Sequence, residues 1–532
     1  MEAFAALLDR LVLTPQRNGK LQLIADYCAS APDPDRGYAI AAITRDLDIP
    51  SVKPAMLRAL VAERVDPVLF ELSYNYVGDL AETISLVWPG MRGANRTPPL
   101  SEVVESLQAA SRSDAPKLVA HYLDSLAPPE RWALIKLATG GLRIGVSARL
   151  AKTALAKFGD LDVTEIEELW HGLAPPYEEM FAWLDGKADK PVSAALAPFR
   201  PVMLAHPIDE EKDLAGIDPD IFAAEWKWDG IRVQAVSEGD TRRLYSRTGE
   251  DIGGAFPDIL AAMEFEAAID GELLVFDPKA DGFLVRSFGD LQQRLNRKTV
   301  SAKLLGSHPA FIRAYDVLTL DGEDLRGAPF MERRARLEQF IAGVKPERFD
   351  LSPLVQFEHL DALTAARAAP PSDAIEGLML KRKAAPYVPG RPKGEWWKWK
   401  RDPFLIDAVM MYAQRGHGKR SSFYSDYTFG VWREDEIVPV GKAYFGFTDE
   451  ELKRLDKYVR DNTVDRFGPV RQVAFGAGEG LVLEIAFEGL NRSTRHKSGV
   501  AMRFPRIHRI RWDKPALEAD RLETLEAMLP AK

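Results

Sequence analysis

The sequence is almost free of cysteine and has no long hydrophobic run. Its single cysteine, Cys28, excludes an intramolecular disulfide and any zinc site built from four cysteines. We expect Cys28, in an apolar helical stretch, to fill the core. No apolar segment approaches the roughly 20 residues that cross a bilayer, and residues 1–20 lack the basic start and apolar core of a secretory signal. We therefore expect a soluble, cytoplasmic protein with no membrane partner.

Basic residues are also fewer than acidic residues. Lys and Arg total 70 against 79 Asp and Glu, which gives a formal net charge of −9. By itself this argues against a nucleic-acid ligand, because phosphate binding relies on basic side chains. The basic residues are concentrated, however, in residues 381–401 and 492–514. An acidic body with two basic surfaces suits a protein that binds a polyanion at selected faces, although two solvated surface patches would give the same pattern.

The length and the apolar patterning indicate a multidomain α and β protein. The 532 residues correspond to about three domains of ordinary size. Residues 1–195 have helical apolar spacing, and residues 193–207 are rich in Ala and Pro, which is typical of a linker. Residues 205–402 alternate strand-like runs with helices, which predicts a largely antiparallel α+β domain. Residues 403–532 are β-rich with one short helix, which fits an OB-fold β-barrel.

Individual elements are expected within these regions. A turn at residues 238–240 between two strand-like runs predicts a β-hairpin. Helices are expected at residues 118–126, 128–139, 331–344 and 449–458. Strands are expected at residues 231–236, 243–247, 268–276, 311–320, 375–381, 396–401, 404–411, 427–432 and 480–487.

The segment with the clearest chemistry is Glu-Trp-Lys-Trp-Asp-Gly-Ile-Arg at residues 225–232. It places Lys227 at the end of an expected strand, between Trp226 and Trp228. A lysine is a nucleophile only without its proton, and apolar walls and nearby positive charge favour that state. The two tryptophans could form such walls. The alternative is an edge strand with an exposed lysine and an Asp-Gly turn at residues 229–230.

This segment resembles motif I of the covalent nucleotidyltransferases, which comprise ATP-dependent DNA ligases, RNA ligases and capping enzymes. In that family the motif I lysine attacks the α-phosphate of a nucleotide and carries the nucleoside monophosphate as a phosphoramidate. Later runs resemble the remaining motifs in the family's order: residues 244–251 (motif Ia), 269–273 (III), 314–317 (IIIa), 376–381 (IV), 397–400 (V) and 511–514 (VI).

The resemblance implies a role for particular side chains, with Lys227 as the catalytic nucleophile. Mg²⁺ or Mn²⁺ would be held by Glu272 and Glu376, largely through water. The implied ATP or AMP contacts are Glu225, Arg232, Arg247 (ribose), Glu272 (ribose or metal), Tyr315 (stacked on adenine), Arg391, Lys398 and Lys400 (phosphates), and Arg511 and Lys514 (pyrophosphate). Each has a structural alternative when taken singly: Tyr315 could be a core residue, and Lys398 and Lys400 could form the wet face of a strand. Seven motifs in the family's order favour the functional interpretation.

Three further runs resemble DNA ligases in particular. Arg-Phe-Pro-Arg at residues 503–506 precedes motif VI, as in those ligases. Gly-Leu-Arg-Ile-Gly-Val-Ser at residues 141–147 resembles their helical DNA-binding domain, where a helix end and glycine backbone would meet phosphates. Residues 415–420 and 446–449 resemble their OB domain. NAD-dependent ligases carry a four-cysteine zinc finger, which Cys28 alone cannot supply.

The resemblance therefore implies an ATP-dependent DNA ligase. Residues 1–195 would be the helical DNA-binding domain, residues 205–402 the adenylation (nucleotidyltransferase) domain and residues 403–532 the OB-fold domain. The protein would act as a monomer on nicked double-stranded DNA in replication, repair or recombination, with little sequence preference because it would contact the backbone. The rival functions are an RNA ligase or capping-type nucleotidyltransferase, and a non-catalytic nick-binding protein.

Overall fold

The computed structural model describes residues 1–89, 97–193, 195–280, 284–295, 297, 299–416, 424–444, 448–494 and 496–529. Contacts between residues group the chain into two units. The central unit comprises Arg17–Gly37 and Val146–Arg401, and the terminal unit comprises Met1–Gln16, Tyr38–Gly145 and Asp402–Lys532. Among the described helices, none is long and apolar enough to cross a membrane.

The helices of the central unit come from both ends of its sequence. Helix α2 packs against α10, which begins after Ser147, where the hydroxyl accepts a hydrogen bond from the Leu150 amide at 3.2 Å. The face of α10 that bears Ala151, Ala154 and Leu155 is buried. The helices are α2 (Arg17–Ser30), α10 (Ala148–Gly159), α11 (Val163–Leu169), α12 (Glu178–Leu184), α13 (Pro257–Ala262), α14 (Phe288–Gln292), α15 (Ala302–Ser307), α16 (Phe330–Ile341) and α17 (Leu360–Ala368).

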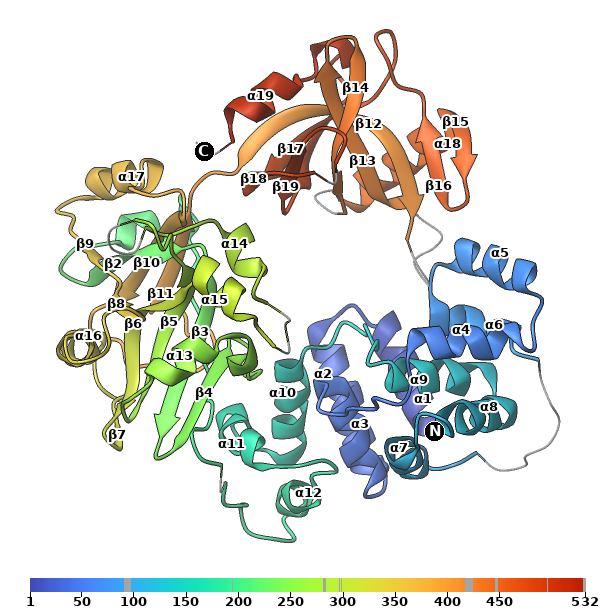
Figure 1. Ribbon diagram of the computed structural model, residues 1–532, viewed down its shortest axis with the longest axis horizontal. Coiled ribbons are helices and arrows are strands. Elements are labelled where there is room, and N and C mark those ends of the chain that lie inside the picture. The colour runs from blue at the N-terminus through green and yellow to red at the C-terminus, as the bar shows by residue number, and fades with distance from the viewer. Residues whose placement is uncertain are drawn as a thin grey trace. The chain divides into compact units, whose positions relative to one another are not determined.

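Two sheets form the β part of the central unit (Figure 1). One has the strand order β1-β11-β10-β2-β9, and the other has the order β4-β3-β5-β6-β7 with β8 beside β6. The β1–β11 and β6–β8 pairs are parallel, and the other described pairs are antiparallel. The strands are β1 (His206–Pro207), β2 (Phe222–Trp228), β3 (Ile231–Glu238), β4 (Thr241–Ser246), β5 (Ala267–Val275), β6 (Ala310–Leu320), β7 (Glu323–Asp324), β8 (Phe349–Leu351), β9 (Leu354–Val355), β10 (Ile375–Arg382) and β11 (Trp396–Lys400).

The chain passes from the first sheet to the second at the Asp-Gly pair between β2 and β3. A side chain at Gly230 would lie 2.5 Å from the Leu273 carbonyl oxygen, so only glycine fits there. The alternative interpretation had placed a turn at residues 229–230; in the structure these residues form a bend that joins two sheets and not two strands of one hairpin. The residue just before this crossing is Trp228, which follows Lys227 at the end of β2.

Part of the segment predicted as a linker is buried in the fold. Ala197, Phe199, Val202 and Met203 are at most 8% exposed and pack with apolar residues of the second sheet and of β11. The Tyr245 hydroxyl donates to the Ala197 carbonyl at 2.8 Å. The linker prediction is wrong for this stretch, because its apolar side chains cover a sheet face that composition alone did not reveal.

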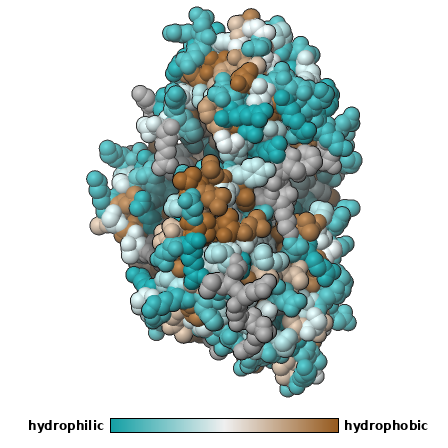
Figure 2. Space-filling model, turned by 90° about the vertical axis from the view of Figure 1, so that its right-hand side faces the viewer, coloured by the Kyte–Doolittle hydropathy of each residue, from teal (hydrophilic) through white to brown (hydrophobic). Residues whose placement is uncertain are grey.

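The helices of the N-terminal region have frequent proline in their first turns, where the missing amide costs no helical hydrogen bond. Helices α5 and α6 leave several large apolar side chains exposed, and Figure 2 shows them gathered on one face. The exposed apolar residues there are Val68, Leu69, Leu72, Tyr76 and Leu86. The helices are α1 (Glu2–Leu13), α3 (Asp35–Thr44, beginning in the central unit), α4 (Pro54–Ala62), α5 (Pro67–Val77), α6 (Leu80–Val87), α7 (Leu100–Ala109), α8 (Ala115–Ser125) and α9 (Pro128–Ala138).

The C-terminal region of the terminal unit is β-rich. Its main sheet has the order β14-β13-β12-β16-β15, with β17 pairing both β12 and β20, and β18 and β19 form a separate hairpin. A capping box of Thr448 and Glu451 begins the predicted helix α18. The elements are β12 (Phe404–Arg415), β13 (Tyr424–Arg433), β14 (Glu436–Ala443), α18 (Asp449–Asp461), β15 (Thr463–Phe467), β16 (Val470–Val473), β17 (Val482–Phe487), β18 (Gly489–Arg492), β19 (Val500–Arg503), β20 (Arg506–Arg511) and α19 (Leu522–Ala527).

The broad fold prediction is confirmed. The N-terminal region is helical, the middle is α+β and largely antiparallel, and the C-terminal region is β-rich, with α18 at the expected place and a second helix, α19, that was not predicted. The predicted hairpin is the β3–β4 pair, in which Glu238 lies opposite Thr241. Residues 417–420 and 446–447, which carry most of the two predicted OB-domain runs, lie outside the described residues.

Candidate active site

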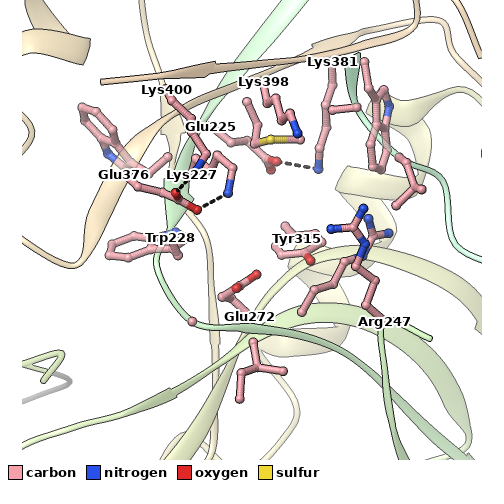
Figure 3. Close-up of a pocket in the computed structure, with 18 of the residues that line it drawn as sticks. Glu225, Lys227, Trp228, Arg247, Glu272, Tyr315, Glu376, Lys381, Lys398 and Lys400 are labelled. Carbon is pink, nitrogen blue, oxygen red and sulfur yellow. Dashed lines mark hydrogen bonds and ion pairs between the residues drawn. The ribbon is translucent and has the colours of Figure 1, made fainter. Parts of the chain in front are cut away.

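A cavity of about 470 Å³ lies between the two sheets of the central unit (Figure 3). Strands β2, β10 and β11 supply side chains from one sheet, and β3, β5 and β6 supply them from the other. Most residues predicted as nucleotide contacts are brought together here. The cavity is lined by the predicted residues Glu225, Lys227, Arg232, Arg247, Glu272, Tyr315, Glu376, Lys398 and Lys400.

Lys227 occupies the penultimate position of β2 and points into the cavity (Figure 3). Its ammonium group is in direct contact with one oxygen of the Glu376 carboxylate. The other Glu376 oxygen lies 2.8 Å from the Lys400 Nζ. One carboxylate thus bridges two lysines, and Lys227 is held at the cavity with its side chain 21% exposed.

The glycine after Glu376 explains why the backbone of β11 approaches that of β10 so closely. Gly377 lies opposite Lys227 on β2 and opposite Lys400 on β11. A side chain on Gly377 would lie 2.3 Å from the Trp399 carbonyl oxygen, and its φ of +149° is one that other residues rarely adopt. The register also shifts at Glu376, which leaves this residue without an opposite partner on β2.

Strand β11 alternates between two environments. Lys398 and Lys400 line the cavity, whereas Trp397 and Trp399 pack in an apolar cluster on the opposite face. Burial, together with the nearby charges of Arg391 and Lys227, lowers the pKa of Lys398. The basic face of this strand therefore concentrates positive charge beside Lys227, as phosphoryl transfer requires.

Two arginines extend this positive field. Burial and the charge of Arg232 lower the pKa of Arg247, which lines the cavity. Arg391 is exposed and is absent from the cavity lining, but it is close enough to Lys398 and Arg247 to lower the pKa of both. Its backbone carbonyl is 3.1 Å from the His206 ring.

Glu272 is the second carboxylate of the cavity. Burial raises the pKa of Glu272 to about 8. The positive charge of Lys227 lowers this pKa and the negative charge of Glu376 raises it, but burial has the largest effect. Among the described residues its carboxylate has no hydrogen-bond partner, and no group of three or more His, Cys, Asp or Glu could enclose a metal. Two carboxylates that face the same cavity still suit Mg²⁺, which keeps several waters and takes few protein ligands.

The Glu225 side of the cavity contains a buried charge cluster whose cations were not predicted. Glu225 is 2% exposed; it forms an ion pair with Lys381 at 2.5 Å and accepts a hydrogen bond from Arg334 at 3.1 Å. The Lys381 ammonium also lies 4.8 Å from the centre of the Tyr315 ring and 4.6 Å from that of Trp396. A flat aromatic wall beside fixed donors and acceptors is the environment that a nucleobase requires.

Arg232 is anchored from behind by buried polar groups. Its guanidinium donates to the fully buried Asp270 at 2.6 Å and to the Met203 carbonyl at 2.6 Å. The Tyr387 hydroxyl donates to the same Asp270 oxygen, and Gln234 donates to the other at 3.1 Å. These hydrogen bonds hold the Arg232 guanidinium at the cavity wall.

Sequence reasoning assigned no role to Lys381, Arg334, Trp396, Asp270 or Tyr387. Lys381 ends the motif IV run, Asp270 lies inside the motif III run and Trp396 directly precedes motif V, so proximity to the motifs was the available signal. Their contacts depend on strand register and on α16, and local sequence does not specify either of them.

The last two predicted residues, Arg511 and Lys514, belong to the terminal unit. Both bind the Asp407 carboxylate of that unit, at 3.2 Å and 2.7 Å.

Two known protein families match this chain. The family described as the ATP dependent DNA ligase domain matches residues 202–400, and the ATP dependent DNA ligase C terminal region matches residues 420–514. A probable DNA ligase of Koribacter versatilis (strain Ellin345) is 30% identical, over 99% of this chain and 96% of that protein. The chain belongs to the ATP-dependent DNA ligase family. Members of this family are enzymes that use ATP to form phosphodiester bonds at nicks in DNA.

Other ligases are similar along the whole chain. DNA ligase 1 of Korarchaeum cryptofilum (strain OPF8) is 28% identical over 98% of this chain and 97% of that protein. A solved structure titled Pmar-Lig_PreS3 is 14% identical and covers 96% of this chain and 99% of its own, with a TM-score of 0.60. That likeness concerns the fold. The cavity lies wholly within residues 202–400, the part matched by the ligase domain family.

Proposed function

We propose that this ligase seals nicks in duplex DNA by carrying AMP covalently on Lys227. In the first step the Lys227 amine, after losing its proton to water, forms a bond to the α-phosphorus of ATP. The bond from that phosphorus to the bridging oxygen breaks, and pyrophosphate leaves. AMP then passes to a 5′-phosphate oxygen as the phosphorus–nitrogen bond breaks and the amine regains a proton. Finally the 3′-hydroxyl attacks the activated 5′-phosphorus, and AMP leaves.

The observation that carries this proposal is the position of Lys227. Its amine opens into a cavity of about 470 Å³, beside Lys398 and Lys400 and in contact with Glu376. To attack the α-phosphorus, the Lys227 nitrogen must carry a free electron pair. Fixed cations placed where charge develops on the phosphoryl oxygens would then lower the barrier to transfer.

The rest of the cavity supports a purine nucleotide. We propose that the base stacks on Tyr315 near Glu225, that Arg247 binds the ribose, and that Lys398 and Lys400 bind the phosphates. Arg391 would approach the phosphates from the rim, since it acts electrostatically on both Lys398 and Arg247. Glu272 and Glu376 would hold Mg²⁺ or Mn²⁺, which supplies Lewis-acid charge neutralisation when bound.

Arg511 and Lys514 would bind the pyrophosphate of ATP during the first step. The β-rich C-terminal region would be an OB-fold barrel, and the helical N-terminal region would bind DNA. Residues 1–195, 205–402 and 403–532 would be the three domains. We further propose a cytoplasmic monomer, without a membrane partner, that binds nicked double-stranded DNA through its backbone phosphates.

Self-adenylation tests the proposal. Incubation with α-³²P-labelled ATP and Mg²⁺ should label the wild-type protein and the control Lys393→Ala, because Lys393 is exposed and outside the cavity lining. Lys227→Ala should show no label, and Lys398→Ala should label at least tenfold more slowly, because each positioned electrostatic contact contributes about 10²–10³ in rate. Label on Lys227→Ala would refute the site, and labelling by GTP in preference to ATP would favour a capping-type enzyme.

A further inference from the structure

The C-terminal region contains a charge cluster that surrounds Arg511 and Lys514. Asp407 on β12 accepts from the Arg511 Nη1 at 3.2 Å and from the Lys514 Nζ at 2.7 Å, both through its Oδ2 atom. Two cations from one short segment, three residues apart, therefore converge on one oxygen. Such convergence is the arrangement by which Arg and Lys side chains bind one phosphate oxygen.

Asp407 is held more firmly than the cations that it binds. Its side chain is 12% exposed, against 19% for Arg511 and 21% for Lys514. Its amide donates to the Asp520 carboxylate at 2.7 Å, and its carbonyl accepts from the Asp520 amide at 2.8 Å. Asp407 is thus held in place by its backbone hydrogen bonds, and its carboxylate positions the two longer and more flexible side chains of Arg511 and Lys514.

The strand register gives a second reason to regard Asp407 as placed for this purpose. On β17, Glu484 lies directly opposite Asp407, and like charges in opposite positions destabilise a sheet. The Arg511 Nη1 lies between them, 3.2 Å from Asp407 and 3.8 Å from Glu484. The positive charge of Arg511 offsets this repulsion, because it is attracted to both carboxylates.

A third carboxylate contacts Arg511 in a different way. Asp513 takes both the Nε and Nη2 atoms, at 3.1 Å and 3.0 Å, but its side chain is 72% exposed. An exposed partner in a turn can be displaced by an incoming anion at little cost. Asp407, whose side chain is 12% exposed and lies on a strand, cannot leave in the same way.

We propose that Asp407 is a positioning residue for the first step: it keeps Arg511 and Lys514 paired and aligned for the pyrophosphate of ATP while the exposed Asp513 yields its place. The inference rests on the proposed role of Arg511 and Lys514 in binding pyrophosphate. It assigns Asp407 no contact with ATP. Its effect should be confined to the step in which pyrophosphate is present.

The test compares two reactions of the full-length protein. Asp407→Asn removes the charge with little change in volume. It should raise the ATP concentration for half-maximal self-adenylation about tenfold, while sealing of a nick that already carries 5′-adenylate stays within about twofold of wild type. The control Glu488→Gln breaks a similar ion pair, 3.0 Å from Arg506, that does not involve Arg511 or Lys514, and both reactions should be unchanged.

A double variant and the single cation variants complete the test. Asp407→Asn should raise the ATP requirement less in the Lys514→Met background than in the wild type, because only Arg511 then depends on Asp407. Equal loss of both reactions by Asp407→Asn and by Asp407→Glu would show a structural role and overturn the inference, as would an unchanged or lowered ATP requirement. If Arg511→Gln and Lys514→Met themselves adenylate normally, the proposed pyrophosphate contact fails, whatever Asp407 does.

Discussion

The two carboxylates of the cavity differ in charge state because their neighbours differ. Burial alone would raise the pKa of both, but contact with Lys227 and Lys400 holds the pKa of Glu376 below its usual value. Glu272 lacks such a contact, and burial raises its pKa to about 8. At neutral pH, Glu376 is therefore ionised and Glu272 is mostly protonated. Such separation between neighbouring acids is characteristic of active sites.

This difference predicts a pH-dependent stability at one residue. In the unfolded chain Glu272 loses its proton near pH 4.3, whereas in the folded protein its pKa is about 8. The folded state therefore binds this proton more tightly than the unfolded state. As the pH rises from about 4.3 towards 8, the folded state loses stability relative to the unfolded state. Glutamine does not titrate. Glu272→Gln should therefore raise the melting temperature of the protein without nucleotide more at pH 8.5 than at pH 5. Calorimetry at both values measures this, and an equal shift at both would contradict the assigned pKa.

The predicted and the unpredicted residues of the site differ in what determines them. Lys227, Glu272, Glu376 and the β11 lysines lie in recognisable runs, and the structure brings them to one cavity. Lys381 was assigned no role, because its contact with Glu225 depends on the β2–β10 register, which places Met379 opposite Glu225. A contact that depends on the register between two strands cannot be predicted from the sequence pattern of either strand alone.

Helix α16 shows the same limit at the scale of an element. Its position was predicted to within a few residues, since Phe330 and Leu337 have helical apolar spacing. The same buried face, however, contains Arg333 and Arg334. The pattern of apolar and polar residues predicts that both arginine side chains are exposed to solvent. Arg333 is fully buried with Asp316 at 2.8 Å, and Arg334 supports Glu225 in the cavity.

The buried pair on α16 predicts a large loss of stability from one substitution. Arg333→Met would leave the Asp316 carboxylate buried without its cation, which costs about 3–5 kcal/mol. The matched control is Arg336→Met on the same helix, because Arg336 is 36% exposed and its partner Glu323 is 58% exposed; such a pair contributes at most about 1 kcal/mol. Urea unfolding followed by tryptophan fluorescence measures both. Equal effects of the two substitutions would contradict the burial of Arg333.

The whole molecule combines a net charge of −9 with local concentrations of basic residues. The net charge would keep nucleic acid away, so binding must rely on local neutralisation of phosphates and release of counterions. The broad division into helical, α+β and β-rich regions followed from periodicity alone. The grouping of residues 17–37 with residues 146–401 did not, because the packing of α2 against α10 joins segments over 100 residues apart.

This charge distribution predicts strong salt dependence. Affinity for nicked duplex DNA should fall by about 10³-fold or more between roughly 50 and 200 mM salt, with little difference between nick sequences. Fluorescence anisotropy with two unrelated sequences, at constant pH and Mg²⁺, measures both properties. Affinity that ignores salt, or that depends strongly on sequence, would contradict binding through the backbone.

The central claim is that one amine at the end of β2 carries the nucleotide. Mass spectrometry of proteolytic fragments, after incubation with ATP and Mg²⁺ and under conditions that preserve phosphoramidates, identifies the modified residue directly. We predict AMP on the fragment that contains Lys227, with fragmentation assigning it to that side chain. AMP on Lys398, Lys400 or any other residue, with Lys227 unmodified, would contradict the account.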